Sequence, residues 1–82
     1  MTRQEIKKAL KGYRNTIKKD KNGFEYCIIN LGFVNAPANF AQFEQSELET
    51  VTEILNDLGY VPMLRTQNHK NGIIEKSLTF YL

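Results

Sequence analysis

The fold is decided by the stretch FEYCIINLGFV at residues 24–34. It is rich in the aromatic and β-branched side chains that favour strands. Successive side chains of a strand point to opposite faces, and here both sets are mostly apolar. We therefore predict an interior β-strand that is covered, at least in part, on both faces. Gly32 interrupts the run and predicts a β-bulge.

The segment after this strand predicts an amphipathic helix. Its apolar residues recur at three- and four-residue spacing, at Leu48, Val51, Leu55 and Leu58. The start of the helix is ambiguous, because Ser46 to Glu49 reads as a capping box while an earlier turn begun at Asn39 is also compatible. Gly59 is well placed as the left-handed residue of a Schellman ending, with Tyr60 beside Leu55.

The last third of the chain predicts a hairpin. Residues 60–67 and 73–82 read as two strands, and Asn71-Gly72 between them is a strong turn signal. The final strand alternates apolar and polar positions, so one of its faces is expected to be buried and the other largely wet. Tyr13 and Tyr81 are expected at core or half-buried positions.

The N-terminal segment predicts a second helix. Thr2 to Glu5 forms a capping box, and apolar residues recur at helical spacing, at Ile6, Ala9, Leu10, Tyr13 and Ile17. Asn22-Gly23 is expected to end this helix. The prediction is a small α+β fold, one domain over residues 1–82, in the order α-β-α-β-β. It has a three-stranded, mainly antiparallel sheet with two helices packed on it.

The composition limits which classes of protein this chain can belong to. In the 82 residues no apolar run approaches the ~18 that cross a bilayer, and no secretory signal is visible, so no membrane role is expected. Cys27 is the only cysteine, which excludes an intramolecular disulfide and fits a reducing compartment. A cytoplasmic location is expected on these grounds. An open three-stranded sheet leaves edges that need cover, so a homodimer is a further hypothesis.

The charges are strongly segregated along the chain. Residues 1–21 hold eight of the eleven basic residues and two acidic ones, which gives +6. Residues 22–64 hold six acidic residues and no basic ones, which gives −6, and the last 18 residues return +2. A net charge of +2 hides this separation, and local fields depend on where the charges lie.

The basic block forms a stripe if the N-terminal segment is one helix. At ~100° per residue its members fall within about 80° of one another and extend over about 22 Å. They are the candidate partner-binding residues Arg3, Lys7, Lys11, Arg14 and Lys18. Like charges four residues apart destabilise a helix by about 0.2–0.5 kcal/mol each, so helix stability alone does not explain this arrangement.

Three interpretations of the stripe stay open. It is solvated or answered by the acidic helix within the same fold, where surface ion pairs contribute little. It docks an acidic protein surface or a second copy of the chain, for which complementary charge sets rate and specificity. In the third interpretation the stripe follows the phosphate backbone of a nucleic acid, although Tyr13 is the only aromatic residue between the basic residues of the stripe.

Catalytic chemistry has little support in the sequence. His69 is the only histidine and falls in the predicted hairpin turn, while Cys27 lies in an apolar strand and is expected in the core. One histidine and one cysteine are too few for a metal site, and no phosphate-binding glycine pattern, cofactor site or small-molecule site is evident. We expect a non-enzymatic binding protein that docks a macromolecule, preferably a protein, through the stripe. A nucleic-acid-binding protein is the alternative, and an enzyme using Cys27 and His69 is the least supported reading.

Overall fold

The centre of the computed structural model, which describes residues 3–82, is the strand β2 (Glu25–Val34). It pairs with β1 (Arg14–Lys19) on one side and with β4 (Ile74–Tyr81) on the other. The strand β3 (Met63–Asn68) pairs with β4, so the order is β1-β2-β4-β3 and every pair is antiparallel. The prediction of an interior strand is confirmed, and the prediction of three strands is wrong, because the sheet has four.

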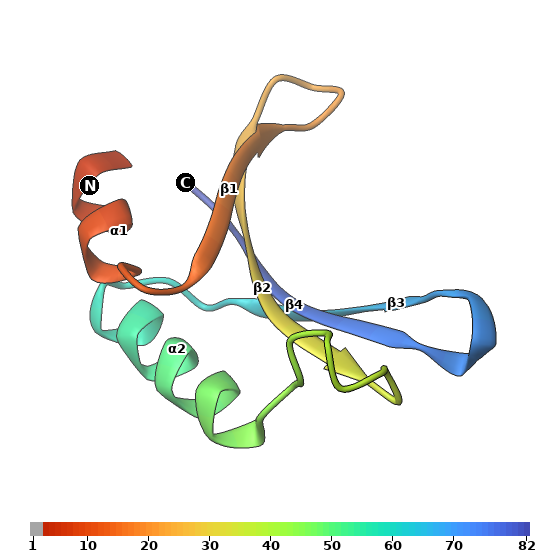
Figure 1. Cartoon of the computed structure of the whole chain (residues 1–82). Coiled ribbons are helices and arrows are strands. Elements are labelled where there is room, and N and C mark those ends of the chain that lie inside the picture. The colour runs from red at the N-terminus through yellow and green to blue at the C-terminus, as the bar shows by residue number, and fades with distance from the viewer. Residues whose placement is uncertain (1–2) are drawn as a thin grey trace.

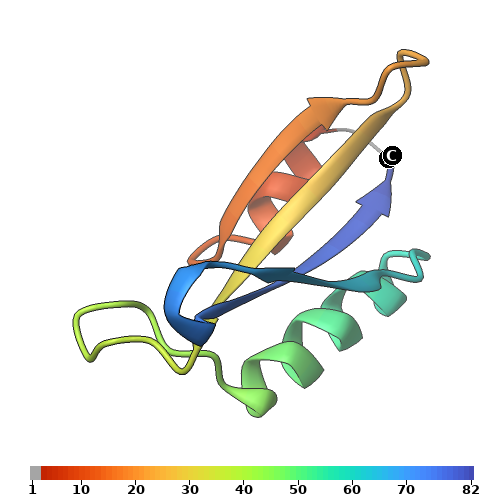
Figure 2. The same cartoon turned by 90° about the vertical axis from the view of Figure 1, so that its right-hand side faces the viewer.

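Two helices cover one face of this sheet. Figures 1 and 2 show α1 (Arg3–Ala9) and α2 (Gln45–Asp57) on the same side, and residues 3–82 place no helix on the other. The buried core lies between the layers and is built from Ile6, Leu10, Cys27, Ile29, Leu31, Val51, Leu55, Leu78 and Phe80. The α+β class is confirmed, but the element order is α-β-β-α-β-β rather than α-β-α-β-β.

The predicted long N-terminal helix is wrong after its second turn. The helix ends at Ala9, and Gly12 has φ of +95°, a left-handed conformation that terminates the helical path. The chain then forms β1, which turns into β2 through residues 20–24. In that turn the Asp20 carboxylate accepts hydrogen bonds from the backbone N–H groups of Asn22 and Phe24, at 2.9 and 3.0 Å. Asn22-Gly23 therefore marks a hairpin, and the predicted capping residue Thr2 lies outside the described residues.

Gly32 forms the bulge that the sequence predicts. The register of β2 against β4 shifts between Asn30 and Gly32, where φ is +109°. A loop over residues 35–43 returns beside this point. There the Phe33 N–H donates to the Ala41 carbonyl at 2.8 Å, and the Phe43 N–H donates to the Phe33 carbonyl at 2.9 Å. The bulge thus ties this loop to the end of β2.

The helix α2 and the hairpin form where the sequence predicts them, but β3 begins at Met63 rather than at residue 60, and the start of α2 also differs. The capping residue is Glu44, without a side-chain hydrogen bond, so the predicted capping box at Ser46 does not start the helix. The Schellman ending is confirmed, since Tyr60 N–H donates to the Leu55 carbonyl at 2.9 Å and Gly59 N–H to that of Asn56 at 2.9 Å. The β3–β4 hairpin is confirmed as well.

Only one face of the sheet is buried. Cys27, Ile29 and Leu31 of β2 face the helices and lie in the core. The alternate residues Tyr26 and Ile28 are half-buried and point to the opposite face, because successive side chains of a strand alternate. The second face of β2 is therefore covered only in part, as expected, because helices pack on one side of the sheet alone, and we call the side without a helix the open face.

Candidate functional site

The open face carries aligned side chains from all four strands. The backbone register sets Arg14 beside Asn30, Asn30 beside Ser77, and Ser77 beside Arg65. This row crosses the sheet at ~4.8 Å per strand, so the Cα atoms of the two arginines lie about 14 Å apart. Between them Asn30 and the buried Ser77 supply hydrogen-bonding groups. The row is therefore a polar strip with a guanidinium group at each end.

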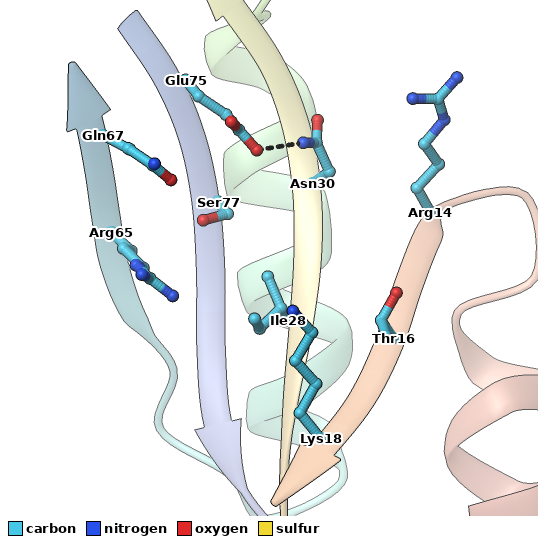
Figure 3. A pocket seen from close by; sticks show the side chains of 9 residues that line it. All are labelled: Arg14, Thr16, Lys18, Ile28, Asn30, Arg65, Gln67, Glu75 and Ser77. Carbon is cyan, nitrogen blue, oxygen red and sulfur yellow. Dashed lines mark hydrogen bonds between the residues drawn. The ribbon is translucent and has the colours of Figure 1, made fainter. Parts of the chain in front are cut away.

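A groove of about 350 Å³ lies over this row (Figure 3). Its lining holds three cations and one carboxylate among nine residues: Arg14, Thr16, Lys18, Ile28, Asn30, Arg65, Gln67, Glu75 and Ser77. The groove thus has a net positive charge and an anion-binding character. An anion entering it meets guanidinium and ammonium groups that are exposed to solvent.

Aromatic side chains lie at one end of the open face. Tyr26 pairs in register with Lys18 on one side and with Tyr81 on the other. The Tyr26 and Tyr81 ring centroids are 5.7 Å apart, and Tyr81 is 59% exposed, more than the half-buried position that we predicted. Its hydroxyl donates to Asp20 Oδ2 at 3.1 Å, and this hydrogen bond raises the pKa of Tyr81. An exposed aromatic platform therefore stands directly beside a lysine.

A second aromatic group lies at the opposite end. Phe33 pairs in register with Glu75, and its ring centroid lies 5.3 Å from that of Phe40, edge to face, and 6.1 Å from that of His69. Glu75 accepts from Asn30 Nδ2 at 2.7 Å through Oε2 and lies 2.8 Å from His69 Nε2 through Oε1. Along β4, the six residue-to-residue steps from Glu75 to Tyr81 put the two ends about 20 Å apart.

The structure separates the five residues of the predicted stripe. Arg3 and Lys7 lie on α1, Lys11 in the following turn, and Arg14 and Lys18 on β1. The premise that one helix carries all five is wrong, because the helix ends at Ala9. Arg14 and Lys18 come together on the open face, whereas Arg3 forms an ion pair with Glu25.

The acidic block lies on the other side of the sheet. Its exposed carboxylates belong to α2 and its capping residue: Glu44, Glu47, Glu49, Glu53 and Asp57. Among residues 3–82, no ion pair joins α2 to α1 or to β1. Both helices lie on the same side of the sheet, and Glu47 of α2 lines a hollow together with Arg14, so the interpretation in which the acidic helix answers the stripe stays a prediction.

Several residues of the open face were not candidates from the sequence. Arg65 lies 51 positions after Arg14 and joins it only because β4 lies between β2 and β3. Tyr26 shares a face with Ile28 in any strand reading of residues 24–34. This alternation is the signal that the sequence contains. It identifies the residues of the open face only when the structure shows which face carries no helix.

Cys27 and His69 are not brought together. Cys27 is buried between the layers, and burial raises the pKa of its thiol, which opposes formation of a thiolate nucleophile. His69 lies beyond the end of β3, beside Glu75 and Phe33. The core position of Cys27 is confirmed, and the pairing that an enzyme using both residues would require is absent from the structure.

Residues 3–82 contain no group of three or more histidine, cysteine, aspartate or glutamate side chains placed to hold a metal ion. None of the helices formed by these residues is long and apolar enough to span a bilayer.

Comparisons of the chain with protein-family models, with curated proteins and with solved structures found no match. Function must therefore be argued from the geometry of the open face.

Proposed function

We propose that this protein is a binding protein whose open sheet face holds a single-stranded nucleic acid. The observation that carries the proposal is the combination of Arg14, Lys18 and Arg65 with exposed aromatic rings on one uncovered face. Single strands are held by cations that follow the phosphates and by aromatic rings on which bases stack. Cations and aromatic rings are both present here, and they are neighbours, because Lys18 pairs in register with Tyr26.

The location of the negative charge also supports the proposal. On the sequence alone, the acidic helix argues against a polyanionic ligand. In the fold, α2 lies behind the sheet, and Glu75 is the one carboxylate in the lining of the groove. The open face therefore offers a polyanion a positive surface.

The length of the face sets the size of the ligand. The aromatic groups at its two ends lie about 20 Å apart. At ~3.4 Å per stacked nucleotide, this span holds at most about six nucleotides, and fewer when the bases are splayed. We expect a short binding footprint without paired strands.

The test compares two triple variants of equal charge. Arg14, Lys18 and Arg65 are replaced by alanine in one, and the exposed Lys7, Lys8 and Lys11 in the other. Binding of a fluorescent oligo-uridine is measured by anisotropy as salt is raised. For the unmodified protein, three phosphate contacts predict a slope of log K against log salt of about −2.

The open-face variant is expected to lose binding, and the variant of α1 and its turn is expected to retain it. Equal losses in both would mean that net charge alone drives association, and would contradict a site on the sheet. If oligo-uridine fails to bind at low salt while an acidic protein is captured through the same three cations, the proposal gives way to the protein-docking alternative.

A further inference from the structure

The far end of the open face holds a cavity beside the groove that contains the three cations. It has a volume of about 540 Å³, within the range of small-ligand pockets. Its walls include Phe33, Phe40, His69, Ile73 and Glu75. The cavity lies between the loop over residues 35–43 and the β3–β4 turn, and it shares Glu75 with the groove of the open face.

The walls of this cavity suit a flat ring. Phe33 and Phe40 meet edge to face at 5.3 Å, and the His69 ring lies 6.1 Å from Phe33. Phe40 is 38% exposed, so part of its surface is available to a ligand. An unstacked nucleobase recovers on such rings the stacking that it loses in leaving its own strand.

Glu75 gives the cavity a hydrogen-bonding preference. An ionised carboxylate has about four acceptor sites on its two oxygens. Asn30 Nδ2 and His69 Nε2 occupy one site on each oxygen, at 2.7 and 2.8 Å. Asn30 is itself fixed, because its Oδ1 accepts from the Gly32 N–H at 2.9 Å. The carboxylate is therefore held in place with one acceptor site left on each oxygen.

Two neighbouring acceptors discriminate among the bases. Guanine presents two adjacent donors, N1–H and the N2 amino group, on its Watson–Crick edge. Adenine and cytosine present one amino group next to a ring acceptor, and uracil presents one N–H between two carbonyl oxygens. A carboxylate repels each of those acceptors, so guanine is the complementary base.

We infer that this cavity binds one unpaired guanine of the single strand, with Glu75 accepting from its N1–H and N2 amino group. This inference rests on the proposed function. Arg14 lies beside Phe33 and Phe40 in an adjoining pocket, where it meets the phosphate that follows the inserted base. The cavity thus adds base specificity at one end of a groove that otherwise reads the backbone.

The experiment measures anisotropy with an oligo-uridine and with versions carrying one guanine, inosine, adenine or cytosine at the same position. Guanine is expected to bind about 5- to 150-fold more tightly than uridine, the range for a bidentate base contact. Inosine lacks the N2 amino group and is expected to fall between the two.

The variant Glu75→Gln replaces one acceptor oxygen with a donor. It is expected to bind oligo-uridine at least as tightly as the unmodified protein and to lose the guanine preference. Glu53→Gln, which makes the same charge change on the exposed face of α2, is the matched control and retains the preference. Phe40→Ala is the second variant and weakens guanine binding without altering the carboxylate.

The outcomes separate the two proposals. If no oligonucleotide binds, the proposed function fails. If all five oligonucleotides bind equally, or if folded Glu75→Gln keeps the guanine preference, the inference of a guanine pocket is overturned while the proposed function stands.

Discussion

Replacing Gly32 with alanine tests the contact that joins the bulge to the loop over residues 35–43. A Cβ at this position would lie 2.8 Å from the Gln42 carbonyl carbon and 2.9 Å from the carbonyl oxygens of Ala41 and Gln42. All three are backbone atoms, and that backbone is held in place because the Phe33 N–H donates to the Ala41 carbonyl and the Phe43 N–H donates to the Phe33 carbonyl. The clash cannot be relieved by rotating a side chain.

The magnitude follows from two separate costs. A positive φ of +109° strains any residue other than glycine, at about 1–3 kcal/mol. Overpacking against a fixed neighbour adds about 1–3 kcal/mol. The sum of about 2–6 kcal/mol is a large part of the total of about 4–12 kcal/mol expected for a domain of this length.

Gly12→Ala is the matched control, because Gly12 has φ of +95° and nothing within 4 Å of its Cβ position. Gly12→Ala therefore introduces the backbone strain of a positive φ without a clash against neighbouring atoms. Urea unfolding followed by circular dichroism gives both free energies of unfolding, provided that the m-values agree. Gly32→Ala is expected to lose about 1–3 kcal/mol more than Gly12→Ala. Equal losses would refute the argument that the loop backbone presses on the bulge.

Two further predictions concern side chains on opposite faces of the sheet. Burial raises the pKa of Cys27 above its ordinary value near 9.0, so iodoacetamide is expected to alkylate the thiol only after unfolding in urea. The raised pKa contributes stability that is fully present below the ordinary pKa near 9.0 and is lost as pH rises above it, so stability should fall in alkaline buffer more than in Cys27→Ala; an equal fall in both proteins would contradict this. Tyr81→Ala is expected to weaken oligo-uridine binding about fivefold or more, because it removes the stacking ring. Tyr81→Phe keeps the ring and loses only the hydrogen bond to Asp20. Equal losses of affinity for the two variants in anisotropy titrations would mean that the hydroxyl, and not the ring, matters.

Local patterns were sufficient where one chain segment determines its own structure. The Schellman ending at Gly59 needs a glycine at one position, and the Asn71-Gly72 turn needs two residues that tolerate positive φ. The strand at residues 24–34 combines high β-propensity with a length that suits a central position. These features were predicted because no distant residue competes with them.

The N-terminal segment shows where local patterns fail. Tyr13 and Ile17 are four residues apart, a spacing that puts both on one face of a helix and also on one face of a strand. The choice between them depends on pairing with β2, which no local signal reveals. The candidate site failed for the same reason, since Arg14 and Arg65 meet only through the strand order β1-β2-β4-β3.

The charge segregation of the sequence becomes a separation in space. Most acidic side chains of α2 lie behind the sheet, whereas Glu47 lines a hollow together with Arg14 at the edge of the sheet. At physiological salt the Debye length is about 8 Å, so the carboxylates behind the sheet are largely screened from the open face. A polyanion at the open face therefore interacts mainly with the charges near that face, which are the three cations, the hydrogen-bonded Glu75 and Asp20 beside Tyr81. Three cations are few, and contact with the aromatic rings must supply the rest of the binding energy. This is the reason that the aromatic rings, rather than the net charge of the chain, decide between a nucleic acid and an acidic protein as the partner.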